Sequence, residues 1–163
     1  MSAEKMLLDA LTTSKKTLAL AESCTGGALA ARLTAIPGAS AAFLGSVVAY
    51  ADAWKENFLG VSASRLRAAG AVSPEVVEAM VHGLFARTSC DVAAAISGIA
   101  GPGGGTPDKP VGTLYIALAK RGHTVHVTKL HAPGTRAENI EFATSAALRL
   151  LLTLVTGENP DGL

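Results

Sequence analysis

The sequence is poor in cysteine and in charge and contains no long apolar run, and each shortage excludes a class of protein. Its two cysteines, Cys24 and Cys90, match no metal-ligand spacing. A chain of 163 residues buries enough apolar surface to fold without a disulfide, so the two thiols indicate a reducing compartment. No apolar run is long enough to span a bilayer, and the N-terminal region carries Glu4, Lys5 and Asp9 in place of a signal-peptide core. The sequence therefore predicts a cytoplasmic protein with no membrane partner.

The charge balance and the apolar content restrict the protein further. The formal net charge at pH 7 is +1 and the basic residues are scattered, whereas proteins that bind a phosphate backbone present a basic stripe. We therefore expect no nucleic-acid partner. Hydrophobic residues make up 49% of the sequence and charged residues 17%, which excludes disorder and predicts some strands buried on both faces. We expect one domain over residues 1–163, with 157–163 as a frayed tail.

Hydrophobic periodicity and turn residues divide the chain into helices and strands. The expected order is helix 6–11, strand 17–21, helix 28–36, strand 43–51, helices 64–69 and 74–88, strands 92–97, 111–119 and 124–130, and helix 136–154. Residues 120–123 indicate a hairpin turn between the last two strands, and two other connections are expected to be crossovers. The sheet is therefore mixed. The prediction is an α/β fold, a single three-layer α/β/α domain with helices on both faces of a mixed sheet.

The junction after strand 17–21 is the most informative part of the sequence. Ser23, Cys24 and Thr25 follow the strand, and then Gly26 and Gly27 precede a helix. A helix N-terminus leaves backbone N–H groups unpaired, and the glycines remove side chains that would keep a ligand away from them. The junction can therefore present a nucleophile beside an anion site. The alternative is an ordinary turn in which Thr25 caps the helix and Ser23 is only solvated.

Two further strand ends carry polar groups. Tyr50 lies near the end of strand 43–51 with Lys55 just beyond it, and Ser97-Gly98 opens the glycine-rich tract 98–105. In open α/β sheets ligands bind beyond the carboxyl ends of the strands. We therefore expect the three strand ends to form one crevice. The glycine-rich tract is either a functional loop of that crevice or a long connector.

Five sequence blocks resemble the C-terminal domain family of the competence/damage-inducible protein CinA. They are AESCTGG at 21–27, GSVVAYADAWK at 45–55, GAVSPEVV at 70–77, SGIAGPGGGTPDKPVGT at 97–113 and APGTR at 132–136. The blocks occur in family order within residues 17–155, and the glycine-rich block is highly specific. The resemblance implies a nicotinamide-nucleotide amidase, which hydrolyses the pyridine nucleotide nicotinamide mononucleotide to nicotinate mononucleotide and ammonia. It also implies a homo-oligomer. The resemblance further implies an additional N-terminal domain in larger family members, and we expect no such domain within these residues.

The resemblance assigns the catalytic role of nucleophile to Ser23 and assisting roles to Tyr50 and Lys55. A serine is a poor nucleophile unless a neighbour takes its proton, and an amine can do so only when it is neutral. Partial burial of Lys55 beside another cation, such as Arg136, would favour that neutral form. Tyr50 either passes the proton on or holds the amine in place. The expected reaction uses no metal and no organic cofactor.

Backbone amides and one arginine complete the expected substrate site. The N–H groups at Thr25, Gly26 and Gly27 are expected to receive the oxyanion of the tetrahedral intermediate. The substrate's phosphate calls for an arginine or bare backbone amides, and Arg136 and the glycine-rich loop offer both. The loop residues expected in the site are Ser97, Gly98, Gly101, Gly103 and Gly104. Alternatively, Arg136 forms a salt bridge with Glu138 or Glu141, and the glycines only connect two strands.

Other residues near these blocks allow competing interpretations. Cys24 is the rival nucleophile, because a thiol at a helix N-terminus ionises readily. Alternation along an extended chain, however, directs Cys24 to the core if Ser23 faces the crevice, and it directs Glu22 away from Ser23. Trp54 departs from the family pattern and either stacks on the pyridinium ring or packs at an oligomer interface. A second candidate function is a nucleotide-binding or protein-interaction module without turnover, and intact Ser23, Tyr50 and Lys55 favour the enzyme.

Overall fold

The structure is a computed structural model that describes residues 1–157. Its elements are α1 (Ala3–Thr13), β1 (Leu18–Glu22), α2 (Ala28–Thr34), the 3-10 helix η1 (Ala39–Ala41), β2 (Phe43–Val48), α3 (Asp52–Leu59), α4 (Ala63–Ala69), α5 (Pro74–Arg87), β3 (Val92–Gly98), β4 (Thr113–Lys120), β5 (His126–His131) and α6 (Arg136–Thr156). Gly157 caps the end of α6. The remainder of the predicted frayed tail, 158–163, lies outside the described residues.

The strands form one mixed sheet of order β2-β1-β3-β4-β5. β1 pairs in parallel with β2 and with β3, whereas the pairs β3–β4 and β4–β5 are antiparallel. At the end of β1, Glu22 lies opposite Val48 on one side and Ile96 on the other. β1 and β2 therefore end level with each other, and β3 continues two residues further, to Gly98, in its pairing with β4. The predicted mixed sheet with a hairpin between its last two strands is confirmed.

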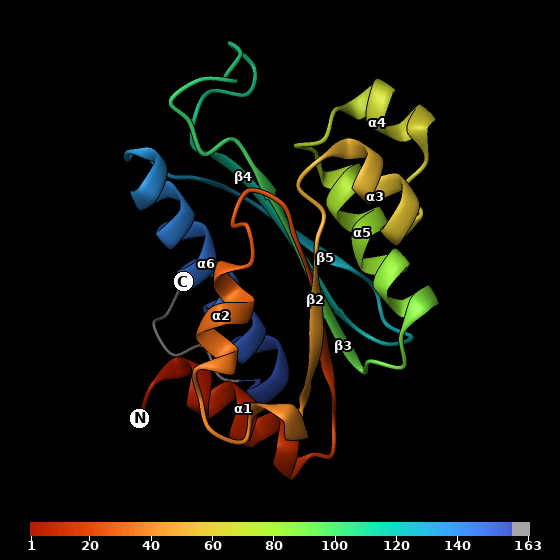
Figure 1. Cartoon of the computed structure of the whole chain (residues 1–163), viewed down its shortest axis with the longest axis vertical. Coiled ribbons are helices and arrows are strands. Elements are labelled where there is room, and N and C mark those ends of the chain that lie inside the picture. The colour runs from red at the N-terminus through yellow and green to blue at the C-terminus, as the bar shows by residue number, and fades with distance from the viewer. Residues whose placement is uncertain (158–163) are drawn as a thin grey trace.

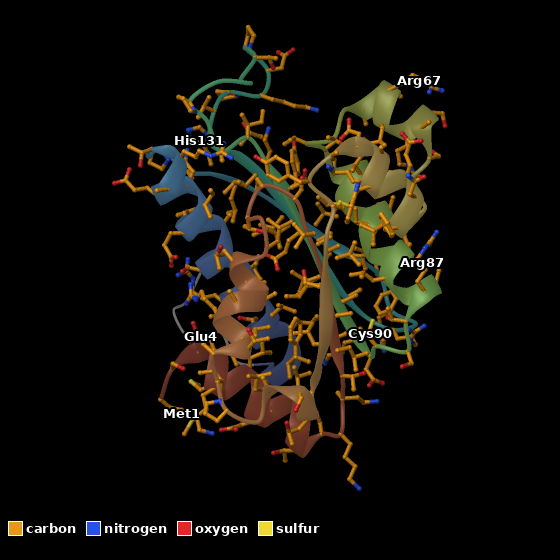
Figure 2. All side chains as sticks on the ribbon, in the orientation of Figure 1. Met1, Glu4, Arg67, Arg87, Cys90 and His131 are labelled. Carbon is orange, nitrogen blue, oxygen red and sulfur yellow. The ribbon has the colours of Figure 1, made fainter. Side chains whose placement is uncertain are left out.

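Helices cover both faces of this sheet (Figure 1), which confirms the three-layer α/β/α prediction. α1, α2 and α6 lie on one face and α3, α4 and α5 on the other. Along β1 the side chains alternate between the two cores: Leu18 and Leu20 pack on the first face, and Ala19 and Ala21 on the second. Side chains fill the space on both sides of the sheet, between Cys90 at one end and His131 at the other (Figure 2).

α3 was not predicted, and the second strand is shorter than expected. The sequence predicted that strand to end at Ala51 instead of Val48, with no helix between it and residue 64. α3 reverses the usual polarity of a surface helix, because Lys55 is 1% exposed while Trp54 and Phe58 are 50% and 47% exposed. A helix with its charge inward and its aromatic rings outward does not give the pattern that predicts an amphipathic helix.

α3 is held against α5 by a close backbone approach. A Cβ atom at Gly83, in the middle of α5, would lie 2.0 Å from the carbonyl oxygen of Leu59, the last residue of α3. Only glycine allows the two helices to come this close. The local starts of α4 and α5 are the predicted ones, since Ser62 and Ser73 accept hydrogen bonds from the first helical turns.

Candidate active site

A cavity of about 290 Å³ lies at the edge of the sheet where β1, β2 and β3 end. The three strand ends that carry polar groups in the sequence therefore share one cavity. The α4–α5 loop and the start of α6 complete its wall. The lining residues are Ser23, Cys24, Tyr50, Asp52, Lys55, Ala71, Val72, Ser97, Gly98, Ile99, Ala100, Gly101, Gly103, Gly104 and Arg136.

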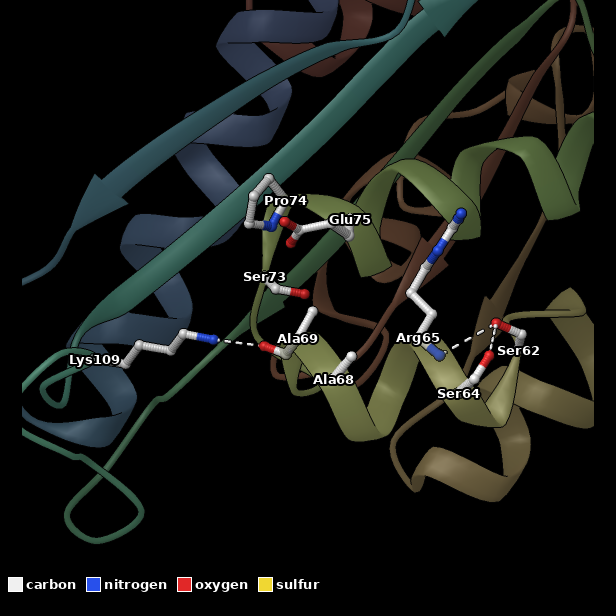
Figure 3. Close-up of a pocket in the computed structure, with 9 residues that line it drawn as sticks. All are labelled: Ser62, Ser64, Arg65, Ala68, Ala69, Ser73, Pro74, Glu75 and Lys109. Carbon is white, nitrogen blue, oxygen red and sulfur yellow. Dashed lines mark hydrogen bonds between the residues drawn. The ribbon is translucent and has the colours of Figure 1, made fainter.

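A larger pocket of about 720 Å³ lies between α4, the start of α5 and Lys109 (Figure 3). Two hydrogen bonds link groups of its wall: the Lys109 ammonium donates to the Ala69 carbonyl over 2.7 Å, and the Ser62 hydroxyl accepts from the Arg65 N–H over 3.2 Å. No residue from a strand end lines it. We therefore take the smaller cavity as the candidate active site despite its smaller volume.

Ser23 follows β1 and lines this cavity with 8% of its surface exposed. Its backbone N–H donates to the carbonyl of Ile96 in the neighbouring strand over 2.9 Å, which extends the β1–β3 pairing by one residue. Within residues 1–157 its hydroxyl has no hydrogen-bond partner, and it is not a fully buried unsatisfied group. The backbone of Ser23 is thus fixed by the sheet, and its unpaired hydroxyl in the cavity is available to a ligand.

Lys55 reaches the same cavity from α3 and is the largest fully buried side chain of the described chain. Its ammonium nitrogen lies 3.3 Å from the Tyr50 carbonyl oxygen and 3.4 Å from an Asp52 carboxylate oxygen. The amine is therefore enclosed by protein and paired with one carboxylate. A second cation was expected beside Lys55, but the closest charged partner is this carboxylate.

Arg136 and Tyr50 meet at the cavity from segments far apart in the sequence. One guanidinium nitrogen of Arg136 donates to the Tyr50 hydroxyl over 2.7 Å, and another donates to the Gly101 carbonyl over 2.8 Å. The proposed salt-bridge partners are engaged elsewhere: Glu138 forms a capping box with Thr135, and Glu141 pairs with Arg32. Among residues 1–157, Arg136 has no carboxylate partner, so its positive charge faces the cavity unneutralised.

The junction between β1 and α2 differs from the expected anion site. Thr25 donates its hydroxyl to the Glu22 carboxylate over 2.8 Å, and the Gly26 N–H donates to the Ser23 carbonyl over 3.0 Å. The helix is capped by Gly27 in a left-handed conformation, with φ of 98°, and not by the Thr25 side chain. Thr25, Gly26 and Gly27 are absent from the cavity wall. The structure thus brings Ser23, but not these three residues, to the cavity.

Cys24 packs in the core on the α2 side of the sheet and touches the cavity wall. Burial, the largest influence, raises the pKa of its thiol to about 11, and the nearby Glu22 carboxylate raises it further. Alternation along the chain predicted this core position for Cys24, and the lowered pKa that would make it the rival nucleophile is not found. The thiol is therefore protonated near neutral pH and is a poor nucleophile.

The glycine-rich segment forms one wall of the cavity. Ser97 is 1% exposed, and its hydroxyl donates to the Ala71 carbonyl over 2.9 Å, which ties the α4–α5 loop to the end of β3. Gly98 serves packing, because a Cβ atom there would lie 2.3 Å from Leu114 Cδ2 and 3.1 Å from the Cys24 sulfur. The other predicted loop glycines, Gly101, Gly103 and Gly104, also line the cavity.

Several lining residues were not predicted from the sequence. Asp52 is a charged side chain two residues after Tyr50, and this proximity was the one signal that could have found it. Ala71, Val72, Ile99 and Ala100 are small or apolar and carry no chemical signal. In the described part of the chain, no three His, Cys, Asp or Glu side chains are placed to hold a metal ion. No helix formed by residues 1–157 is long and apolar enough to cross a membrane.

Comparison with known proteins gives the family. The family model of the CinA C-terminal domain matches residues 1–155. The chain belongs to the CinA C-terminal domain family. A CinA-like protein of Chlorobium luteolum is 44% identical over 161 residues, which cover 96% of this chain and 37% of that protein. Another, of Thermotoga neapolitana, is 50% identical over 121 residues, covering 74% and 30%. The chain thus spans about a third of the length of these CinA-like relatives.

Solved structures of the CinA family share the fold. The competence/damage inducible protein CihA from Agrobacterium tumefaciens is 34% identical with a TM-score of 0.89, covering 94% of this chain and 99% of that one. A competence or damage-inducible protein from Enterobacter asburiae is 31% identical with a TM-score of 0.90, covering 94% and 96%. The family resemblance of the five sequence blocks is confirmed.

Proposed function

We propose that this CinA-family chain is an amidase that hydrolyses the carboxamide of nicotinamide mononucleotide to nicotinate mononucleotide and ammonia. The observation that carries the proposal is the unpaired hydroxyl of Ser23 in one cavity with the buried Lys55 and the unneutralised Arg136. A nucleophile, a base and an anion-binding group are three of the parts that this reaction requires of the protein.

In the proposed reaction the Ser23 oxygen attacks the carboxamide carbon, and its proton passes to the neutral amine of Lys55. The C–N bond of the tetrahedral intermediate then breaks, and the departing nitrogen takes that proton and leaves as ammonia. Water attacks the resulting ester, which releases the carboxylate and restores the Ser23 hydroxyl. For the first step the Lys55 amine has to turn from the Tyr50 carbonyl toward Ser23, and contacts of this kind are often completed only when substrate binds.

The phosphate of the nucleotide fits the Arg136 side of the cavity. A guanidinium presents its donors in a planar fork that suits phosphate oxygens. One of these donors now binds the Tyr50 hydroxyl, so a phosphate at Arg136 would compete for it. Tyr50 would then be released toward Lys55, whether it passes on a proton or only positions the amine.

The test is release of ammonia from nicotinamide mononucleotide. The wild-type chain should release ammonia and nicotinate mononucleotide in equal amounts, and Ser23→Ala should lose at least about a thousandfold in kcat. Ser62→Ala, at the start of α4 beside the other pocket, is the matched control and should keep full activity. A wild-type chain that binds the nucleotide without releasing ammonia would support the binding module instead. A chain that neither binds nor hydrolyses it would reject both functions.

We propose in addition that the chain acts as a homo-oligomer in the cytoplasm. Trp54 and Phe58 are about half exposed on α3, with their ring centroids 4.5 Å apart. Leu44 and Val48 are exposed on β2, which is an edge strand of the sheet. Exposed aromatic rings beside a free strand edge are typical of surfaces that become covered in an assembly. The free thiols of Cys24 and Cys90 fit a reducing compartment.

A further inference from the structure

Glu22, the last residue of β1, holds a carboxylate that is 0% exposed. Four donors surround it. One carboxylate oxygen accepts from the Thr25 hydroxyl over 2.8 Å and from the Leu29 N–H over 3.0 Å. The other oxygen accepts from the Ala30 N–H and from the Ser46 hydroxyl, each over 3.0 Å. A buried carboxylate is costly unless its oxygens are hydrogen-bonded, and here both are.

Two of these donors are backbone N–H groups in the first turn of α2. They are among the groups that a helix leaves unpaired at its N-terminus, where the helix dipole also favours a negative charge. The side chain of Glu22 therefore occupies the N-terminus of α2 at Leu29 and Ala30, close in sequence to Thr25, Gly26 and Gly27, whose N–H groups were predicted to receive the oxyanion. An anionic group of a substrate is left with the Arg136 side of the cavity.

The same contacts determine where Ser23 lies. The bond from Thr25 to Glu22 closes a turn around Ser23 and Cys24, and the Gly26 N–H to Ser23 carbonyl bond closes it a second time. The Ser46 hydroxyl ties this turn to β2. Because successive side chains of an extended chain point to opposite sides, anchoring the Glu22 side chain directs that of Ser23 the other way, to the cavity.

We infer that Glu22 is a positioning residue, which acts through the Ser23–Gly27 turn to hold the Ser23 oxygen in the cavity. This inference rests on the proposed function. Glu22→Gln is the sharpest test, because the glutamate and glutamine side chains have nearly the same shape. Each carboxylate oxygen of Glu22 accepts a hydrogen bond from one backbone N–H. In either orientation the glutamine NH₂ group therefore faces another donor, and one of these two hydrogen bonds is lost.

The first readout is amidase kinetics. Glu22→Gln should lower kcat at least about tenfold and change KM by less than about twofold, because Glu22 does not line the cavity. The second readout needs no turnover: a fluorophosphonate probe, from which a serine oxygen displaces fluoride, should label Ser23 more slowly by a similar factor.

Two control variants separate positioning from global stability. Leu8→Ala removes a buried side chain from α1 and should lower the melting temperature while kcat and the labelling rate stay within about twofold of wild type. Ser46→Ala removes a single donor and leaves the turn intact, so both rates should stay within about threefold. Each measurement is made at a temperature at which all variants are folded.

The inference is overturned if Glu22→Gln lowers the melting temperature but keeps wild-type kcat and labelling, or if Leu8→Ala loses as much of both. Should Glu22→Gln fail to fold, Thr25→Val removes one donor of the turn, and an unchanged labelling rate in that variant overturns the inference. A wild-type chain that labels at Ser23 but releases no ammonia refutes the proposed function alone, and the labelling rates of the variants still decide the role of Glu22. A wild-type chain without labelling refutes the positioning of a reactive serine.

Discussion

Gly83→Ala should weaken the fold and the candidate site together, although alanine is the better helix residue. The substitution on α5 gains about 1 kcal/mol of helix propensity. Its Cβ atom, however, would lie 2.0 Å from the Leu59 carbonyl oxygen, so α3 has to retreat by about 1 Å to reach even 3.0 Å. Overpacking of this kind costs about 1–3 kcal/mol, and after the gain in propensity we expect a net loss of up to about 2 kcal/mol. For a chain of this size the melting temperature then falls by up to about 8 °C.

The same retreat moves the base. Lys55 lies one helical turn before Leu59 on α3, and a displacement of about 1 Å at a reacting group can cost about a hundredfold in rate. Thermal unfolding and ammonia release from nicotinamide mononucleotide measure the two effects. His82→Ala, the neighbouring exposed position of α5, should change neither by much. A Gly83→Ala chain that melts higher than wild type and keeps its kcat would refute this account of how α3 is held.

Four other predictions follow from single contacts. Cys24→Ser should keep most amidase activity, and iodoacetamide should not modify Cys24 at pH 8, because burial raises the pKa of this thiol to about 11. Rapid alkylation of Cys24 with loss of activity would instead favour a thiolate mechanism. Lys55→Arg should be inactive at every pH while still binding the nucleotide, since arginine keeps its proton; an active variant would leave Lys55 with a purely electrostatic role. The Thr17 N–H holds the pKa of Asp91 below its usual 3.8, so Asp91→Asn should cost about 1 kcal/mol at pH 7. The difference in unfolding free energy between wild type and Asp91→Asn should shrink as the pH falls below about 4 and through the pKa of Asp91 in the folded protein. Urea unfolding measures this difference, and a value that does not change with pH would contradict the prediction. Trp54→Glu should shift the chain to a smaller species in size-exclusion chromatography, and an unchanged elution volume would place the interface elsewhere.

The sequence by itself determined most elements and their order. Short apolar runs, cap residues such as Ser73 with Pro74, and glycines at turns act over a few positions, so they predict local structure from local sequence. The same local pattern placed Ser23 just after a strand. In the structure Ser23 follows β1 and its backbone N–H bonds to β3, which extends the β1–β3 pairing. The mixed sheet followed from the number of crossovers and hairpins.

Only the tertiary structure decided which polar groups meet and which are already satisfied. The pairing of Arg136 with Tyr50 joins residues 86 positions apart, and the Ser46 hydroxyl reaches Glu22 from the neighbouring strand β2. The burial of Lys55 depends on α3 turning its charged side chain inward against α5, a choice that local periodicity argues against. The sequence did not indicate that Glu22 binds the N-terminus of α2. A helix N-terminus attracts any anion, and only the structure shows that the carboxylate bound there is the protein's own. Long-range contacts of this kind depend on packing, which no short window of residues contains.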